Sequence, residues 1–347
     1  MKEKGIDAAL IGPGPDLRYL TGYETKPSER LTVLVVTTTE APVLLVPNLE
    51  ARRVGDLGLE VRAWGETEDP VELAANLLGE PSTAAVADHL WSVFLIRFGE
   101  RLPRTEWTAA SELTAPLRIR KDHDEVNALR EAAQAVDRVM HRIPDEVRFS
   151  RRTEAQVARQ LAEMTIEEGH ETAEFTIVAS GTNGASPHHE PGDRVIEKGD
   201  FVVCDFGGRI DGYYSDCTRT FSVGRPSPLQ AEIHAIVRSA NETGRELIEP
   251  GITCGELDSE VRTVVSERGH GQNFIHRTGH GIGLEVHEPP YIVEGNDQPL
   301  EPGMTFSVEP GIYLEGMFGV RIEDIVVCTE NGSETLNQAS REVVVVS

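Results

Sequence analysis

Two aspartates interrupt a pair of apolar, strand-like runs in the second half of the chain. The stretch VCDFGGRIDGYYSDCTRTF carries Asp205 and Asp216 on either side of RIDG, which is a turn signal. If Ile210 and Asp211 occupy the two loop positions, Asp205 lies directly opposite Asp216 on one face of the hairpin. Carboxylates that close repel each other and push one pKa upward unless a cation lies between them. The alternative is a one-residue shift in register, which turns both side chains to solvent.

A second hairpin repeats this arrangement with two glutamates. The stretch MTFSVEPGIYLEGMFGVRIEDIVV carries Glu309 and Glu323, and a turn centred on Gly316 places them opposite each other. Pro310 interrupts the ladder between them, because proline has no backbone N–H to donate. Either pair alone suits a solvated surface, but two such pairs on apolar ladders indicate a shared cation site.

Two further segments contribute histidines. HRTGHGIGLEVHEPP contains His276 and His280, and its glycines favour a loop and a strand over a helix, so the two imidazoles do not share a helical face. VASGTNGASPHHEPGD, a Gly/Pro-rich loop before the first hairpin, contains His188 and His189. We expect His189 to be a loop residue without a part in the site.

Four carboxylates and one imidazole form an oxygen-rich ligand set. Such a set suits two divalent cations bridged by carboxylates, with Mn²⁺ as the first choice and Co²⁺ or Zn²⁺ as alternatives. Two ions about 3.5–4 Å apart hold a hydroxide nucleophile and polarise a carbonyl. The residues therefore predict metal-assisted hydrolysis.

Charge and composition exclude several other classes of protein. The 347 residues include 33 basic and 58 acidic side chains, a net charge of −25, which argues against a nucleic-acid or anionic-membrane surface. No run approaches the roughly 20 apolar residues of a membrane span, and the first residues lack a signal-peptide core, so we expect a cytoplasmic protein. The four cysteines show no CxxC spacing and are predicted to be buried, reduced thiols; the alternatives are a disulfide or a zinc site.

The pattern of elements predicts two domains. Residues 1–115 alternate short apolar strands with helices, which is typical of an α/β domain. Residues 116–122 are predicted to be a linker, and 123–347 to be an α+β domain with helices on one side and antiparallel hairpins on the other. Within it, the spacing of apolar residues predicts a helix opening near 122 and a second beginning at Thr153. Two later helices are expected over 229–248 and 253–269.

Together, CDFGG…YYSDCTRTF, HRTGHGIGLEVHEPP, SVEPGIY and VRIEDIVV resemble, in this order, the proline-specific metallopeptidases of the pita-bread fold. This group includes Xaa-Pro dipeptidase (prolidase), aminopeptidase P, methionine aminopeptidase and the metal-free creatinase. The resemblance covers the whole chain. DAALIGPGPDLRYLTGY is similar to the creatinase-type N-terminal domain, which separates the chain from methionine aminopeptidases.

The resemblance implies a role for each metal ligand. Asp205 is implied to bind one metal, Asp216 and Glu323 to bridge both, and His280 and Glu309 to complete the other. Creatinase-like proteins lose these ligands, and all five are present here.

The resemblance also implies catalytic and substrate-binding residues. His287 matches a histidine that contacts the scissile carbonyl, and His188 one that assists near the leaving proline nitrogen. His276 matches a substrate-pocket histidine, Arg321 a group that orients the carboxylates, and Glu309 is implied to take the proton from the attacking hydroxide.

One position departs from the family pattern. Many prolidases carry an arginine four residues after the position of His287, where it binds the dipeptide carboxylate, but this chain has Tyr291 there. The loop YETKPSERL offers Lys26 and Arg30 as substitutes, with Arg30 first because a guanidinium binds a carboxylate bidentately. In this fold the N-terminal domain is implied to overhang the active site of its own chain or of a partner in a homodimer.

The sequence therefore predicts an Xaa-Pro dipeptidase that acts on proline-containing dipeptides or short peptides. An aminopeptidase P, which releases the first residue of longer Xaa-Pro peptides, is the alternative. A non-catalytic peptide-binding module is a more distant one, and an acidic metal-storage protein would need ligands spread over the surface.

Overall fold

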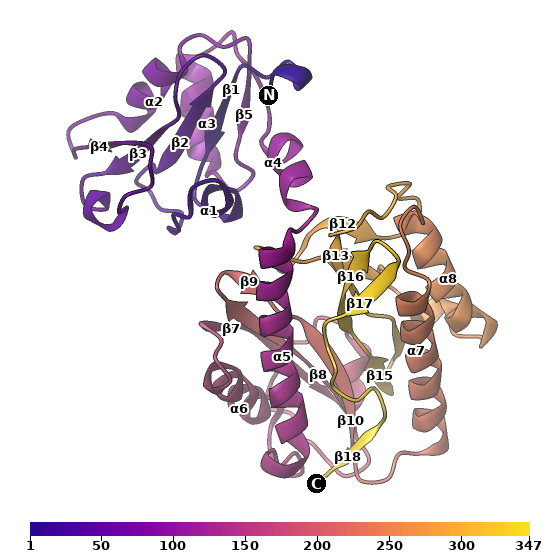
Figure 1. The fold of residues 1–347 in the computed structure, drawn as a ribbon. Coiled ribbons are helices and arrows are strands. Elements are labelled where there is room, and N and C mark those ends of the chain that lie inside the picture. Colours follow the sequence, from indigo (N-terminus) through magenta and orange to yellow (C-terminus); the bar gives the residue numbers. More distant parts are fainter. The chain divides into compact units, whose positions relative to one another are not determined.

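All 347 residues are described in the computed structural model, and they form two compact units, Met1–Arg118 and Ile119–Ser347 (Figure 1). The predicted linker, 116–122, runs from the last turn of one helix, α4, to the residue that caps the next, α5. No helix combines the length and the apolar character needed to cross a bilayer.

The first unit is a six-stranded mixed sheet covered on both faces. The strand order is β4-β3-β2-β1-β5-β6. Along β1, Ala8 and Leu10 pack into one core with Phe98 of α3, while Ala9 and Ile11 pack into another with Leu17 of α1. Burial on both faces explains why β1 is continuously apolar. The elements are η1 (Lys2–Lys4), β1 (Ala8–Ile11), α1 (Pro15–Thr21), β2 (Val33–Thr37), β3 (Val43–Pro47), η2 (Ala51–Arg53), β4 (Glu60–Trp64), α2 (Pro70–Leu78), β5 (Thr83–Val86), α3 (Ser92–Arg101), β6 (Glu106–Ala109) and α4 (Ser111–Arg118).

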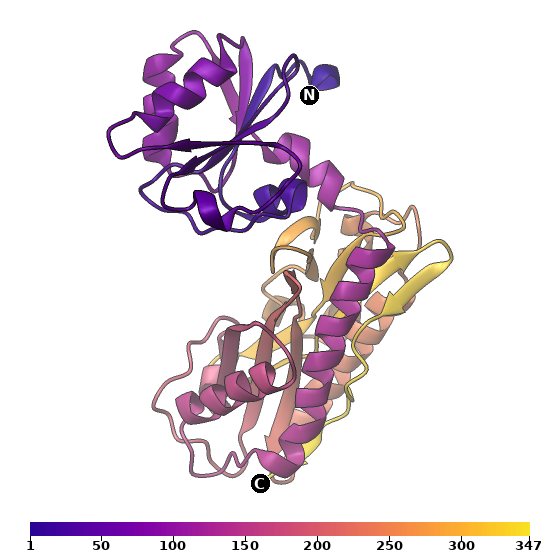
Figure 2. The same ribbon diagram turned by 60° about the vertical axis from the view of Figure 1, so that its left-hand side comes forward.

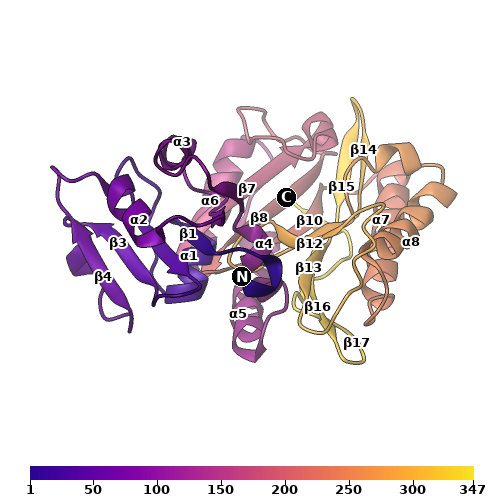
Figure 3. The ribbon, with the colours of Figure 1, turned by 90° about the horizontal axis from the view of Figure 1, so that it is seen from above.

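The second unit is built from two main sheets and four long helices. One sheet has the order β18-β10-β8-β7 with β9 paired to β8, the other β12-β11-β13-β16-β17, and β14-β15 is a separate ribbon. Helices α5 and α6 pack on the first sheet, as Figure 2 shows, through a core that includes Val136, Leu161 and Phe206. Helices α7 and α8 lie side by side, with α7 next to β14 and β15 (Figure 3). The predicted mixed architecture is confirmed.

The helices of this unit are α5 (His123–Glu146), α6 (Glu154–Glu167), α7 (Pro228–Glu246) and α8 (Cys254–Glu267), with short turns η3 (Gly181–Ala185) and η4 (Gly271–Asn273). The strands are β7 (Thr172–Ser180), β8 (Phe201–Ile210), β9 (Tyr213–Tyr214), β10 (Cys217–Val223), β11 (Gly279–Gly281), β12 (Glu288–Ile292), β13 (Thr305–Val308), β14 (Gly311–Leu314), β15 (Phe318–Arg321), β16 (Asp324–Thr329), β17 (Gly332–Thr335) and β18 (Val344–Val346).

Each long helix begins with a capping box. The capping side chains belong to Asp122, Thr153, Ser227 and Thr253, and each is reciprocated by an acid or glutamine three residues later. This arrangement satisfies two backbone N–H groups that the first turn leaves unpaired. The helix starts predicted near 122 and at Thr153 are confirmed.

The register of the first hairpin differs from the prediction. Its loop residues are Asp211 and Gly212, at φ 47° and 79°, one position later than predicted. Asp205 therefore pairs with Thr218, and the prediction that it faces Asp216 directly was wrong. The residue opposite Asp205 is therefore two positions further along the partner strand than predicted. Because side chains alternate with a period of two, Asp205 and Asp216 still lie on the same face of the hairpin. Asp216 lies just before β10, where the ladder is interrupted.

The second hairpin has the predicted register. Leu314 pairs with Phe318 in the β14–β15 ribbon, and β13 pairs with β16 beyond it. Glu309 and Glu323 lie between these two ladders, where Pro310 ends the pairing. Both glutamates are thus on backbone that leaves the sheet.

All four cysteines are buried and none forms a disulfide, as the sequence predicted. Cys204 and Cys217 belong to the core under α5 and α6, on the side of the hairpin away from the aspartates.

The excess of negative charge makes the stability of the fold depend on salt. We expect the melting temperature to rise by several degrees between low and molar NaCl, because added ions screen repulsion among surface carboxylates. Differential scanning calorimetry measures this, and KCl should give the same rise if screening is the cause. A fall in the melting temperature would show that surface ion pairs, such as those of Arg142 with three glutamates, outweigh the repulsion.

Candidate active site

A cavity of about 650 Å³ lies within the second unit. All five predicted metal ligands line it, together with four other predicted site residues, His188, His276, His287 and Arg321. Its walls are formed by Phe175, Ile177, Pro187, His188, Asp205, Asp216, His276, Arg277, His280, Val286, His287, Glu309, Arg321 and Glu323. Tyr291 does not line the cavity, and Arg30 lies in the other unit, where it pairs with Glu29 and Glu66.

Irregular points in the sheets bring the acidic residues together. Asp216, Glu309 and Glu323 each lie in a short gap between two strands, whereas Asp205 lies within β8 and His280 within β11. A gap in a ladder releases the backbone from the pleat and lets a side chain turn toward a common point. Two hairpins and the strand β11 therefore supply the whole group.

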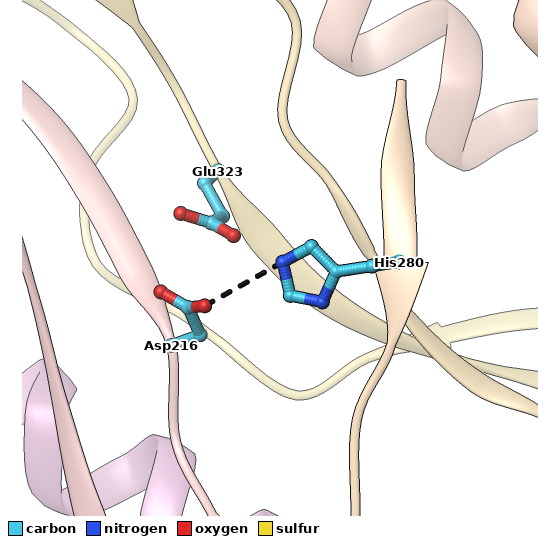
Figure 4. A group of neighbouring side chains, drawn as sticks. All are labelled: Asp216, His280 and Glu323. Carbon is cyan, nitrogen blue, oxygen red and sulfur yellow. Dashed lines mark ion pairs between the residues drawn. The ribbon is translucent and has the colours of Figure 1, made fainter. Parts of the chain in front are cut away.

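Asp216, His280 and Glu323 form the centre of this group, as Figure 4 shows. One ligand atom of each lies within 4.8 Å of the others. The His280 Nε2 atom is 3.7 Å from Asp216 Oδ2 and 3.3 Å from Glu309 Oε1. The other ring nitrogen, Nδ1, is 3.2 Å from the Gly281 carbonyl oxygen; donation to that oxygen leaves Nε2 as the free lone pair.

Three carboxylate oxygens at this centre are buried without a hydrogen-bond partner. They are Asp205 Oδ1, Asp216 Oδ1 and Glu323 Oε1. A buried charged oxygen without a partner costs several kcal/mol in principle, so such atoms are rare unless a cation binds them. The donor set of carboxylates and one neutral imidazole is the one that divalent metals of intermediate hardness prefer. These residues fit a divalent metal.

The electrostatics of the centre lead to the same conclusion. Burial raises the pKa of Asp216 and Glu323, and neighbouring carboxylates raise both further. Burial also raises the pKa of Glu309 to about 7, although Arg321 opposes the shift. Burial lowers the pKa of His280, which keeps the imidazole neutral and able to bind a metal.

Arg321 supports the acidic group from behind. It is 4% exposed; its Nη2 donates to Asp205 Oδ2 at 2.6 Å and its Nε donates to Thr218 Oγ1 at 3.0 Å. The Thr218 hydroxyl in turn donates to Glu323 Oε2 at 2.7 Å. One guanidinium and one hydroxyl therefore hold two of the carboxylates in a single hydrogen-bonded chain.

Thr218 was missed by the sequence analysis, although a signal was present. It lies two residues after Asp216, so strand alternation places it on the same face. Tyr313 is a second residue of the same hydrogen-bonded network. Its hydroxyl accepts from Arg321 Nη1 at 2.8 Å and lies 2.9 Å from His276 Nε2, which links the acidic group to the histidine side of the cavity.

The histidines occupy different positions around the cavity. The His287 ring stands perpendicular to that of His280, with centroids 4.1 Å apart, and it is exposed. His188 is exposed in the loop after η3, whereas His276 is partly covered and burial lowers its pKa to about 4. His189, as expected, is a loop residue outside the cavity wall.

Arg277 is a cavity residue that the sequence analysis did not single out. Its guanidinium lies 4.6 Å from the centre of the Tyr291 ring, a cation–π contact that fixes the side chain without using its N–H groups. Tyr291 itself pairs with His280 across β11 and β12. The tyrosine at the divergent position thus supports an arginine supplied by the segment just before β11.

These features, a pita-bread α+β unit with a carboxylate-rich divalent metal site, define a metal-dependent peptidase with a separate N-terminal α/β unit. The chain belongs to metallopeptidase family M24, which matches residues 127–330, while residues 1–120 match the Creatinase/Prolidase N-terminal domain. The resemblance and the fold class predicted from the sequence are confirmed.

Known relatives span the whole chain. A Mycobacterium tuberculosis protein named probable dipeptidase PepE is 42% identical over 351 residues, covering 99% of this chain and 93% of that protein. The crystal structure of a prolidase from Thermococcus sibiricus has a TM-score of 0.95 at 37% identity, covering 99% and 96% of the two chains. An X-Pro aminopeptidase from Thermotoga maritima has a TM-score of 0.86 at 34% identity, covering 99% and 97%.

The Thr218 hydroxyl provides a test of the acidic group. We expect Thr218→Val to weaken divalent metal binding about tenfold to a hundredfold, because Glu323 and Arg321 each lose a partner that orients them. Isothermal titration calorimetry with Mn²⁺ measures the effect. The control is Thr218→Ser, which keeps the hydroxyl and should bind nearly as tightly as the native chain; equal weakening in both variants would contradict the argument.

Proposed function

We propose that this protein is an Xaa-Pro dipeptidase, which hydrolyses the imide bond of dipeptides with a C-terminal proline. The observation that carries the proposal is that one cavity contains both the carboxylate-rich metal site and an arginine that makes no ion pair. That arginine, Arg277, lines the same cavity as the Arg321–Asp205 ion pair but has no carboxylate partner of its own. The relatives named dipeptidase and prolidase support the same substrate class.

Two divalent cations, Mn²⁺ first with Co²⁺ or Zn²⁺ as alternatives, are proposed to bind at the acidic group. Asp205 would hold one ion, His280 and Glu309 the other, and Asp216 and Glu323 would lie between them. Cations bound there supply Lewis-acid activation of water and of the scissile carbonyl.

The surrounding side chains supply the remaining chemistry. The Glu309 carboxylate accepts the proton of the attacking water, and a His287 ring N–H donates to the carbonyl oxygen as negative charge develops on it. His188 lies on the cavity wall where it can donate to the leaving proline nitrogen. His276, hydrogen bonded to Tyr313, shapes the substrate pocket, and Arg321 keeps Asp205 and Thr218 in place.

Arg277 is proposed to bind the carboxylate of the substrate. The other cavity arginine, Arg321, already donates to Asp205, Thr218 and Tyr313, so its N–H groups are engaged. Arg277 uses only its face, on Tyr291, and leaves its N–H groups available for a bidentate contact. Arg30, the clamp predicted from the sequence, remains the alternative.

A homodimer and a cytoplasmic location complete the proposal. Four buried cysteines without a disulfide suit a reducing compartment. The dimer is carried over from the family resemblance of the sequence, and light scattering on the purified chain would measure its mass in solution.

The substrate class is tested by a paired assay. We expect the Mn²⁺-loaded protein to cleave Met-Pro and to leave the tripeptide Arg-Pro-Pro intact, because a carboxylate clamp limits the substrate to two residues. Removal of the metal with EDTA should abolish cleavage, and Mn²⁺ should restore it. Cleavage of the tripeptide would establish the aminopeptidase alternative, and inactivity on both peptides would refute the catalytic proposal.

The clamp is tested by Arg277→Met. We expect KM for Met-Pro to rise about tenfold to a hundredfold while kcat changes little, because a charge-assisted contact to the bound carboxylate is lost in ground and transition states alike. Met-Pro amide, which lacks the carboxylate, should be cleaved equally by both forms. The matched control is Arg30→Ala; a rise in KM there, with none in Arg277→Met, would assign the clamp to Arg30.

A further inference from the structure

The loop of residues 181–192 brings Pro187 and His188 to the cavity wall without belonging to a sheet. It follows β7 through the short turn η3 and has no ladder that fixes its path. A histidine on such a loop is useful only if other contacts hold the backbone, since loops are otherwise mobile.

A single buried carboxylate accepts hydrogen bonds from residues at both ends of this loop. Glu154, the first residue of α6, has no exposed surface. Its oxygens accept hydrogen bonds from the Ser180 backbone N–H and hydroxyl at 2.8 and 2.7 Å, from Asn183 Nδ2 at 3.1 Å, from His189 Nε2 at 2.7 Å and from the Gly192 N–H at 3.3 Å.

These donors decide the charge of Glu154. Burial acts to raise the pKa of this carboxyl, but the hydrogen bonds from Ser180, His189 and Asn183 outweigh it and hold the pKa below its ordinary value. The position at the N-terminus of α6 also favours a negative charge. An ionised carboxylate is therefore stable in the core because the loop surrounds it with N–H and O–H groups.

The opposite side of the loop packs directly on the β14–β15 ribbon. A Cβ atom on Gly319 would lie 1.9 Å from the Gly184 carbonyl oxygen, so the two backbones touch and any side chain there would separate them. The Pro187 carbonyl also accepts a long hydrogen bond, 3.4 Å, from Arg321 Nη1. The loop is thus held between α6 and the ribbon that carries Arg321.

We propose that His189 and Glu154 are positioning residues for His188, and that the hydrogen bond between them fixes the loop which holds His188 at the cavity wall. The side chain of His189 is 21% exposed and does not reach the cavity, so its effect passes through the backbone to its neighbour. This inference deepens the proposed function and relies on it only for the activity assay.

The test is a double-mutant cycle on the metal-loaded full chain. We expect His189→Ala to lower kcat for Met-Pro about tenfold in the native background and less than about twofold in a His188→Ala background, since a positioning residue has nothing left to position there. His189→Gln keeps an N–H donor and should restore most of the activity. His141→Ala, an exposed histidine on α5, is the matched control and should change nothing.

Hydrogen–deuterium exchange provides a second readout that needs no substrate. We expect His189→Ala to raise exchange over 181–192 selectively, with β8 and β10 unchanged. An equal loss of activity in both backgrounds, no change in the exchange of the loop, or a rise in exchange throughout the unit would each overturn the proposal. If the native chain cleaves neither peptide, the proposed function fails, and exchange alone then decides whether His189 holds the loop.

Discussion

Repulsion among buried carboxylates is the constraint on which the catalytic unit depends. Asp205, Asp216 and Glu323 are each less than a tenth exposed, and the Glu309 side chain beside them is 14% exposed. In a low dielectric such a group is unstable without positive charge, so the fold must hold the side chains rigidly and leave room for cations. Three features hold these side chains in place: the gaps in both hairpins, the hydroxyl of Thr218 and the guanidinium of Arg321.

Because side chains alternate along β10, the face that lines the cavity is separate from a second group of buried ion pairs on the opposite face. Arg219, next to Thr218, points away from the cavity; its Nη1 donates to the Glu323 carbonyl at 2.6 Å and its Nη2 to Asp324 Oδ1 at 2.7 Å. Asp324 is fully buried and also accepts from Arg341. A buried pair of this kind is costly to break, because either partner alone would be an uncompensated charge. It ties the two hairpins together at the level of the acidic side chains, which keeps their spacing constant.

The residues proposed for substrate selection and those proposed for catalysis are held in place by different contacts in the same cavity. The acidic centre is held by sheet backbone and by hydrogen bonds to buried groups, whereas the arginine proposed to select for a carboxylate is held by the face of Tyr291. A cation–π contact leaves the N–H groups of a guanidinium unused, unlike an ion pair. Replacement of the usual arginine by Tyr291 is therefore compatible with the same substrate class, because Arg277, in the segment before β11, supplies the cation.

Local signals in the sequence were enough to predict the helix starts at Asp122 and Thr153, the turn at Gly316 and the residue types of the acidic group, since capping, turn chemistry and alternation act within a few residues. The family resemblance extended this to the whole fold. The register of the first hairpin was wrong by two residues because either loop position satisfies the same turn signal, and the choice depends on positive φ at Asp211 and Gly212. Contacts such as Arg277 with Tyr291 or His189 with Glu154 join residues 14 and 35 positions apart, through side chains that no local pattern orients. Only tertiary packing decided those, because their energy comes from burial and from partners that the folded chain alone brings together.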